Sequence, residues 1–323
     1  MSATNWTTIF ESFNTKRVLV VGDAMIDAYM WGHINRQSPE APIPIVDISK
    51  HEQRLGGAAN VAVNIKSLGA IPILCTVVGS DKSSFTELMN QQNLTTEGVL
   101  FENRKTTTKT RIIAENKHQL RVDEEDLFPI QNESEFIDNT SRLMQTVDVV
   151  ILQDYNKGVL TPHVIKTLCS NAKSLKKHLL VDPKKDNYWD YQKADLFKPN
   201  LNELQQSCAE SIDINKLDAL SAIVQKQRQK LKAKLFLLTL SQHGVFIQNN
   251  DHSQLYPAFK RQVIDVSGAG DSVIATAALA LACELHTDQI AQLSNLAGGL
   301  ACEKVGVNPT EKERLLEEAS RLI

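Results

Sequence analysis

Short runs of consecutive apolar residues recur along the chain and are separated by longer segments of mixed polarity. The runs cover residues 17–22, 71–78, 147–152, 178–181 and 235–240. Because the hydrophobicity within a run is continuous rather than alternating, both faces of each strand must be buried, as in a parallel sheet with helices above and below. The pattern therefore predicts an α/β fold.

The segments between these runs have the length or the apolar spacing of helices. They cover residues 58–68, 82–92, 162–175, 217–231 and 272–283, and a terminal helix is expected at 313–321. The apolar stretch at 273–283 is too short to span a bilayer and is expected to form a buried helix. The regular alternation of strands and helices is stronger evidence for the fold than any single segment.

Residues 34–48 and 106–122 break this rhythm, because polar and apolar residues alternate in them. The first segment interleaves prolines with isoleucine and valine, and the second alternates threonine, lysine and arginine with isoleucine. A period of two with a polar face is typical of an antiparallel sheet exposed on one side. We expect the two segments to form a flap or lid that stands off the main sheet.

The composition of the 323-residue chain excludes several classes of protein. A net charge of −3 provides no basic field for nucleic acid or for a membrane surface. The five cysteines are scattered without a C-x-x-C pair, which argues against a disulfide framework or a zinc site and for a reducing cytoplasm. No signal peptide is recognisable at the N-terminus. We therefore expect a cytoplasmic protein that acts on small molecules.

The segment DVSGAGDS at residues 265–272 runs straight into an apolar helix. Gly268 and Gly270 have no side chains, so backbone N–H groups can approach an anion, which the helix N-terminus also favours. Asp271 lies at the start of this helix, where a carboxylate near a phosphoryl group can accept a proton from an attacking hydroxyl. Taken alone, an ordinary loop with a helix cap explains the segment equally well.

Two further motifs offer hydrogen-bonding groups to a sugar. Asp23 and Asp27 follow the first strand, and ligands gather at the carboxyl ends of strands in open α/β sheets. Gly56 and Gly57 allow the backbone to approach a ligand, and the amide of Asn60 offers both a donor and an acceptor. A tight turn or a helix start is the alternative interpretation of each motif.

Other segments carry residues that can bind phosphate or a nucleotide. Asn200 and Glu203 lie at a strand-to-helix junction and can arrange an amide and a carboxylate around hydrated Mg²⁺, although helix capping explains this pattern as well. Lys157 and Lys184 follow predicted strands and can neutralise a phosphate, with a surface lysine as the alternative. The turn after residues 235–240 offers two hydroxyls and a glycine: Thr239, Ser241 and Gly244.

Taken together and in order, GD at 22–23, GGAAN at 56–60, N-x-x-E at 200–203 and GAGD at 268–271 resemble the ribokinase-like (PfkB) carbohydrate kinases. The resemblance covers nearly the whole chain. It implies one ribokinase-like domain over residues 1–323, a three-layer α/β/α fold with a mostly parallel central sheet, and a small β-sheet lid at approximately 30–54 and 106–123. It also implies ATP and Mg²⁺ as cofactors, and a homodimer formed through the lid.

The resemblance implies a role for each matching residue. Asp271 corresponds to the catalytic base, and Gly268, Ala269 and Gly270 correspond to the backbone anion hole. Asp265 begins the signature, and carbonyl groups near it are expected to hold a monovalent cation such as K⁺. Asn200 and Glu203 correspond to the motif that binds magnesium and phosphates. The sugar-side positions are Asp23, Asp27, Gly56, Gly57 and Asn60, and the nucleotide-side positions are Lys184, Thr239, Ser241, Gly244 and Asn295.

A narrower resemblance lies in SPEAPIP at 38–44, DYNKG at 154–158 and VDPK at 181–184. These segments are similar to kinases of D-glycero-β-D-manno-heptose 7-phosphate, which make the 1,7-bisphosphate for ADP-heptose and the lipopolysaccharide core. Substrate contacts are then expected from Ser38, Glu40, Asp154 and Lys157. Cations for the distal phosphate are expected among Lys109, Arg111, Arg121 and Arg54, with lid-surface charge as the alternative. Because the sequence ends at Ile323, we expect the adenylyltransferase domain that is fused to many such kinases to be absent, and a separate adenylyltransferase can act in the same pathway.

Two other functions stay open. The chain can be a kinase for another sugar or sugar phosphate of the fructose or tagatose type, which a panel of substrates would distinguish. It can also be a nucleotide- or sugar-binding regulator without catalysis. The presence of Asp271, of the glycine loop and of Asn200 with Glu203 argues against the regulator.

Overall fold

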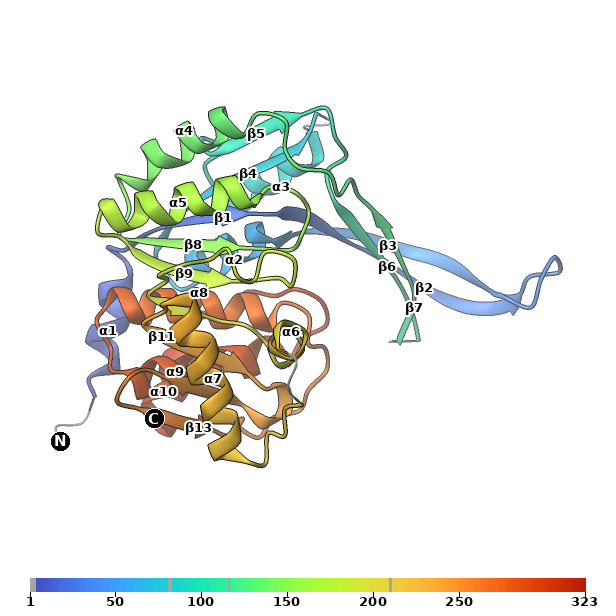
Figure 1. Cartoon of the computed structure of the whole chain (residues 1–323). Helices are drawn as coiled ribbons and strands as arrows, with labels where there is room; N and C mark the ends of the chain where they lie inside the picture. Colours follow the sequence, from blue (N-terminus) through green and yellow to red (C-terminus); the bar gives the residue numbers. More distant parts are fainter. Residues whose placement is uncertain (1–3, 81–82, 116, 209–210) are drawn as a thin grey trace.

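The computed structural model describes residues 4–80, 83–115, 117–208 and 211–323. Of the sequence predictions, those for Lys82 and Asn116 lie outside the described residues. The described chain contains a sheet of nine strands and a sheet of four. Figure 1 shows helices on both sides of the large sheet and the small sheet projecting away from it.

The large sheet is mostly parallel. Its order is β13-β12-β11-β10-β9-β8-β1-β4-β5. Only β12 has the opposite direction to the other eight strands. Each of the five predicted apolar runs overlaps one of these strands, which confirms the α/β prediction. Four strands with four residues or fewer were not predicted from the sequence: β5, β10, β12 and β13. The bounds are β1 (Arg17–Gly22), β4 (Ile71–Gly79), β5 (Val99–Glu102), β8 (Val149–Gln153), β9 (His178–Asp182), β10 (Leu196–Phe197), β11 (Leu235–Thr239), β12 (Val245–Gln248) and β13 (Ser253–Tyr256).

Alternate residues of the strands enter two separate hydrophobic cores, one on each face of the sheet. In β1, for example, Val18 and Val20 belong to one core, and Leu19 and Val21 belong to the other. This arrangement confirms the predicted three layers. The first core is covered by α1 (Trp6–Phe13), α2 (Ala58–Ser67), α3 (Ser83–Gln91), α8 (Ala269–Ala282), α9 (Thr287–Ala301) and α10 (Lys312–Leu322), and the second by α4 (Glu133–Met144), α5 (Pro162–Ser174), α6 (Leu201–Ser207) and α7 (Leu217–Leu231).

Helix α8 begins earlier than the sequence predicted. It starts at Ala269 instead of Ser272, directly after Gly268, whose φ of 78° is in the left-handed region. Residues 269–271 are therefore the first turn of a helix and not part of a loop. No helix in the described part of the chain is both long enough and apolar enough to cross a membrane. All five cysteines lie in the described ranges, and none of them forms a disulfide.

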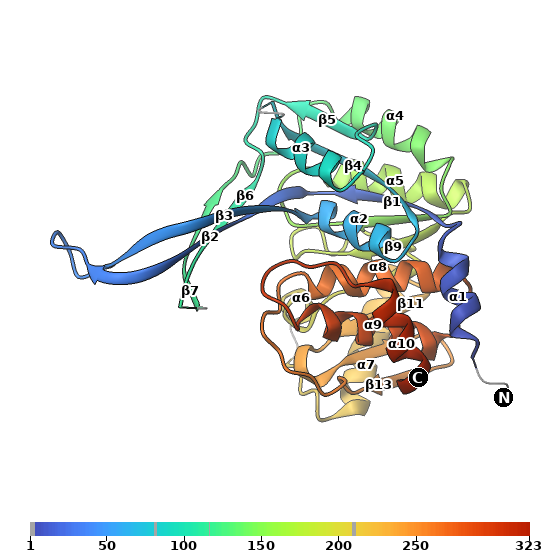
Figure 2. The same ribbon diagram turned by 180° about the vertical axis from the view of Figure 1, so that it is seen from behind.

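The small sheet has the order β3-β2-β6-β7. Strands β2 (Ala24–Gln37) and β3 (Pro44–Gly57) form one hairpin, and β6 (Thr108–Ala114) and β7 (Lys117–Glu124) form the other. The small sheet itself is confirmed, but it is not purely antiparallel, because β2 and β6 run in parallel. The first hairpin is also longer than the predicted 34–48. Figure 2 shows this hairpin reaching well beyond β6 and β7, away from the large sheet.

Candidate active site

Acidic residues gather at the carboxyl ends of three neighbouring strands. Asp23 follows β1, Asp154 follows β8, and Asp182 is the last residue of β9. These strands lie side by side in the order β9-β8-β1. The edge formed by their ends is where an open α/β sheet binds its ligands.

Asp271 lies in the first turn of α8 and is only 4% exposed. Its Oδ2 accepts a 2.7 Å hydrogen bond from the amide of Asn60, and its Oδ1 accepts a 2.7 Å bond from the hydroxyl of Tyr155. The amide of Gln153 donates a longer bond of 3.4 Å to Oδ1. Burial outweighs these donors and raises the pKa of Asp271 to about 6. A carboxylate with this pKa is ionised at neutral pH and suited to accept a proton.

The backbone next to Asp271 is suited to an anion. The first N–H groups of a helix have no intrahelical acceptor, and Gly270 and Asp271 belong to the first turn of α8. Gly268 has a φ of 78°, which favours glycine, and a Cβ there would also crowd Nδ2 of Asn60 at 3.1 Å. A Cβ at Gly270 would lie 3.8 Å from Nζ of Lys198. A buried ammonium is therefore close to this helix end.

The structure brings four residues around Asp271 that were not predicted to belong to the site: Gln153, Tyr155, Asp182 and Lys198. Asp182 accepts a 2.9 Å hydrogen bond from Gln153 and pairs with Nζ of Lys198 at 3.0 Å. Lys198 is 2% exposed and Asp182 is 5% exposed. All four residues end a strand of the large sheet or follow it within two positions. A polar residue at the carboxyl end of a predicted strand is therefore a sequence signal for a site residue.

Asp23 and Asp154 are occupied by donors of the protein itself. Asp23 accepts backbone hydrogen bonds of 2.8 to 3.1 Å from three N–H groups of the loop at 155–159. Asp154 accepts the hydroxyl of Tyr191 at 2.8 Å and the amide of Asn187 at 3.1 Å. Burial raises the pKa of both carboxyls, that of Asp154 to about 6. Asp23 therefore holds the loop that carries Tyr155, and Asp154 holds the segment at 187–191.

The GGAAN segment connects the small sheet to Asp271. A Cβ at Gly56 would lie 2.2 Å from Oδ2 of Asp27 on the adjacent strand, so only glycine leaves room for this carboxylate. Gly57 has a φ of 58° and is the N-cap of α2. This turn places Asn60 in the first part of α2, where it reaches Asp271.

The cations predicted to bind the substrate are paired with acids. Nζ of Lys109 and Nζ of Lys157 approach Glu125 to 3.6 and 2.8 Å, which brings these two predicted substrate residues together. Arg111 pairs with Asp27. A bound phosphate would have to replace these carboxylates as the partner of the cations, or share the cations with them.

Ser38 and Glu40 are not brought to the other predicted substrate residues. They lie in the turn between β2 and β3, where the N–H of Glu40 donates to the hydroxyl of Ser38 at 3.1 Å. Figures 1 and 2 show this end of the hairpin far from the large sheet. In this conformation, the two residues do not approach the Asp271 of their own chain.

A second cluster of polar side chains lies beside the residues around Asp271. It consists of Lys184, Asn200 and Glu203. Asn200 is the N-cap of α6, and its side chain and that of Glu203 form reciprocal bonds to backbone N–H groups at 2.9 and 2.8 Å. The capping interpretation is therefore correct for this pair. Lys184 pairs with Glu203 and lies 5.3 Å from the ring centre of Tyr155. Although burial works against its charge, Asp182 and Glu203 raise the pKa of Lys184 above its ordinary value.

The side-chain oxygens of Asn200 and Glu203 suit a hydrated magnesium ion. One oxygen of Glu203 accepts from Lys184 and the other from the N–H of Asn200, but each oxygen has a further lone pair. Mg²⁺ at nucleotide phosphates keeps several bound waters, and these waters can donate hydrogen bonds to such lone pairs. Within the described ranges, no group of three or more His, Cys, Asp or Glu side chains could hold a metal directly. The two residues could hold a magnesium ion together with water and nucleotide phosphates.

The remaining nucleotide-side residues lie around β11. Thr239 ends this strand and forms a β-bridge with Asn200. Ser241 has a φ of 52° and Gly244 a φ of 92°, and a Cβ at Gly244 would lie 2.0 Å from a backbone oxygen, so this turn requires glycine. Asn295 of α9 donates to the carbonyl of Pro257 at 2.8 Å. Thr239 therefore adjoins the second cluster, whereas Asn295 holds a neighbouring loop.

Residues 15–314 match a family profile described as pfkB family carbohydrate kinase. The chain is 37% identical to "Bifunctional protein HldE" of Koribacter versatilis (strain Ellin345), over 96% of this chain and 64% of that protein. It is 38% identical to the protein of the same name from Campylobacter jejuni (strain RM1221), over 92% and 63%. The chain thus spans slightly less than two thirds of the length of these relatives.

Solved structures of sugar kinases are similar in fold. Phosphofructokinase-2 from Escherichia coli, in complex with substrates and products, has a TM-score of 0.79 and 16% identity, over 95% of this chain and 99% of that one. Ribokinase from Thermotoga maritima has a TM-score of 0.66 and 18% identity, over 94% and 99%. Identities this low show a shared fold alone, and they confirm the predicted ribokinase-like architecture.

Proposed function

Since this chain belongs to the pfkB family of carbohydrate kinases, we propose that it transfers the γ-phosphoryl group of ATP to the anomeric hydroxyl of D-glycero-β-D-manno-heptose 7-phosphate. The product would be the heptose 1,7-bisphosphate, a precursor of ADP-heptose and of the lipopolysaccharide core. The observation that carries the proposal is a buried Asp271 beside the N-terminus of α8, with a pKa of about 6. The segments SPEAPIP and DYNKG and the 37% identity to Bifunctional protein HldE support the heptose substrate.

In this mechanism, Asp271 accepts the proton of the sugar hydroxyl while that oxygen attacks the γ-phosphorus. The hydroxyl of Tyr155 holds Oδ1 in the free protein, so the incoming hydroxyl would replace it there. The backbone of Gly268, Ala269 and Gly270 and the ammonium of Lys198 would stabilise the charge on the transferring group. When bound, Mg²⁺ supplies further positive charge at the phosphates.

The sugar phosphate would lie between the small sheet and the strand ends. Asp27 faces this region from β2, and Asn60 reaches Asp271 from α2. Lys109 and Lys157 already converge on one carboxylate, so we propose that they bind the distal phosphate together with Arg111. Closure of the small sheet would exclude water that could otherwise react with ATP.

ATP would extend from Asp271 towards Lys184, Asn200, Glu203 and Thr239. These residues follow β9, β10 and β11, which are neighbours in the sheet. We further propose a cytoplasmic location, where ATP is supplied and cysteines stay reduced.

The substrate proposal is tested by kcat/KM on a panel of sugar phosphates with ATP and Mg²⁺. Heptose 7-phosphate is expected to exceed fructose 6-phosphate and tagatose 6-phosphate by about 100-fold or more, because a pocket that pairs each hydroxyl discriminates strongly. A preference for the fructose or tagatose compound would favour the other sugar kinase. Absence of ATP consumption with every sugar would favour the regulator.

The pH dependence of this activity is expected to follow Asp271. Its carboxyl must be ionised to act as a base, so kcat/KM should fall as the pH decreases through about 6 and level off above about 7. An ordinary aspartate would move this limb about two units lower. The measurement is kcat/KM between about pH 5 and 8, with circular dichroism at each pH to exclude unfolding. A profile that stays level down to about pH 5 would contradict the role of Asp271.

We propose that the protein is a homodimer formed through one face of the small sheet. The strand register aligns Met30, Ile112 and Leu120 across β2, β6 and β7, so these apolar side chains share a face. Leu120 is 57% exposed, and Val122, two positions further along β7, is 44% exposed. A second copy packed on this face would bury the apolar stripe.

The change Leu120→Glu is expected to make the protein monomeric at micromolar concentration, because it puts a charge into the centre of the proposed interface. Light scattering coupled to gel filtration measures the mass. Leu217→Glu is the matched control, because Leu217 is 45% exposed at the start of α7. A monomeric unmodified protein, or a Leu120→Glu variant that stays dimeric, would refute this interface.

A further inference from the structure

The side chain of Arg54, on β3, lies in a cluster of oxygen atoms in the loop that follows α9. Its Nη1 donates to the carbonyl oxygens of Val305 and Val307 at 3.3 and 2.9 Å, and to the side-chain oxygen of Asn308 at 3.0 Å. Glu52 neutralises the same guanidinium with contacts of 2.6 and 2.7 Å. Carbonyl oxygens that converge on one point are also the ligands of a monovalent cation. In this chain, a guanidinium nitrogen is at that point.

This loop is bonded directly to the segment that leads into the anion hole. The N–H of Gly306 donates to Oδ2 of Asp265 at 2.8 Å. Oδ1 of Asp265 accepts the N–H and the hydroxyl of Ser267 at 3.0 and 2.8 Å. Although burial works against it, these bonds lower the pKa of Asp265, so its negative charge is retained beside the loop. The Arg54 cluster is thus one hydrogen bond away from Asp265.

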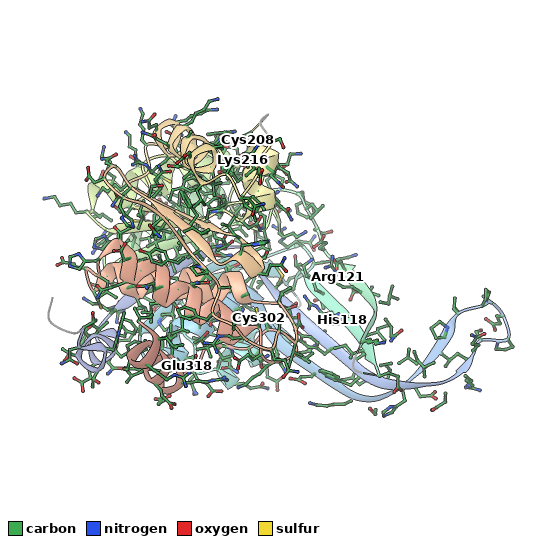
Figure 3. The ribbon with its side chains drawn as sticks, turned by 90° about the horizontal axis from the view of Figure 1, so that it is seen from below. His118, Arg121, Cys208, Lys216, Cys302 and Glu318 are labelled. Carbon is green, nitrogen blue, oxygen red and sulfur yellow. The ribbon has the colours of Figure 1, made fainter. Side chains whose placement is uncertain are left out.

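Tyr29 holds Arg54 and the loop in place. Its hydroxyl accepts the N–H of Val307 at 3.0 Å, and its ring centre is 5.2 Å from the guanidinium of Arg54. Gly306 has a φ of 77°, and a Cβ there would lie 2.7 Å from the Tyr29 hydroxyl. Figure 3 shows the long hairpin extending from the body of the molecule, with His118 and Arg121 on the neighbouring strand β7. Nε2 of His118 lies 3.9 Å from Asp265, so two strands of the small sheet approach this segment.

We propose that the guanidinium of Arg54 takes the place of the monovalent cation that the sequence led us to expect beside Asp265. The carbonyl oxygens of Val305 and Val307, on either side of the Gly306 that bonds Asp265, already accept hydrogen bonds from a permanently charged group. The chain therefore carries its own cation there and needs no added K⁺. Arg54 is a positioning residue, because it acts on the anion hole through the loop and Asp265, and it links β3 of the small sheet to that site.

A thermal-stability measurement tests this inference without substrate. An ion that binds only the native state raises the melting temperature with its concentration. The unmodified protein, in tetramethylammonium buffer, is expected to change by less than about 1 °C when K⁺ replaces tetramethylammonium at constant ionic strength. Arg54→Ala should melt at a lower temperature and recover part of the difference in K⁺. A saturable K⁺-dependent rise in the unmodified protein would overturn the inference.

A kinetic measurement, which rests on the proposed function, gives a second readout. The unmodified protein should change less than about twofold in kcat with K⁺. Arg54→Ala should lose about ten- to a hundredfold in the absence of K⁺, as expected for a lost charge-assisted contact, and recover several-fold with K⁺ or guanidinium.

The control variants separate charge from packing. Arg54→Lys keeps the charge and should retain most activity without K⁺, whereas Arg36→Ala, on an exposed part of β2, should behave as the unmodified protein. An Arg54→Ala variant that neither K⁺ nor guanidinium restores would show a purely structural role and overturn the inference. If the unmodified protein phosphorylates no sugar, the proposed function fails, and the thermal measurement alone decides about Arg54.

Discussion

Asp271→Asn is expected to lower kcat by about 10³-fold or more, while the affinity for ATP changes by less than about twofold. General-base catalysis contributes about 10²- to 10⁴-fold, and an amide of the same size cannot accept the proton. The N-terminus of α8 and the Lys184 cluster are unchanged by this substitution, so nucleotide binding should persist. Initial rates with heptose 7-phosphate and calorimetric titration with ATP measure the two quantities.

Asp190→Asn is the matched control for this variant. Asp190 is exposed in the turn region after β9, and the same chemical change there should leave both quantities at their original values. A kcat of Asp271→Asn above about one tenth of the original would refute its role as the base. An equal loss of ATP affinity would point instead to a disturbed α8.

Lys198→Met is expected to have the second largest effect, in two separable ways. It removes a buried ammonium close to Gly270, which should lower kcat by about 10²- to 10³-fold, as for other groups that stabilise transition-state charge. It also leaves the buried carboxylate of Asp182 without its ion-pair partner, which should lower the free energy of unfolding by about 3 to 5 kcal/mol. Denaturant titration and initial rates measure the two effects.

The double variant Lys198→Met with Asp182→Asn separates these contributions. Replacing the unpaired carboxylate with an amide should restore much of the free energy of unfolding, because no isolated charge stays buried. The amide oxygen can still accept the hydrogen bond from Gln153. The rate should stay low. Recovery of both stability and rate would show that Lys198 acts only through the fold.

Most of the large sheet was predictable from the sequence because its central strands are buried on both faces. β1 and β9, for example, appear as uninterrupted apolar runs. β10 has two residues and no recognisable pattern, so its existence depends on the backbone bonds offered by β9 and β11. The start of α8 was missed because Ala269 and Gly270 belong to a glycine-rich segment in the sequence, and only the structure shows that Gly268, with its positive φ, is the N-cap of the helix.

The candidate site was predictable in part, and the misses have a common cause. Asp271 and Asn60 were named as site residues, but nothing in the sequence indicates that their side chains share a hydrogen bond across 211 positions. Lys198 was overlooked because a lysine before Pro199 resembles any surface lysine, and only burial beside Asp182 makes it different. Ser38 and Glu40 were grouped with the substrate residues, but the length of the hairpin separates them from the strand ends.

The sequence by itself determined the layered α/β architecture, the small sheet, the family and the candidate base, because local periodicity and ordered motifs are written in consecutive residues. Only the tertiary structure decided which groups hold that base, which lysine is buried beside it, and that Arg54 enters the carbonyl cluster near Asp265. Each of these contacts joins a residue of a strand or helix to a residue of a loop that lies elsewhere in the sequence. Their geometry depends on how the strand ends and the small sheet meet, and no stretch of consecutive residues encodes that meeting.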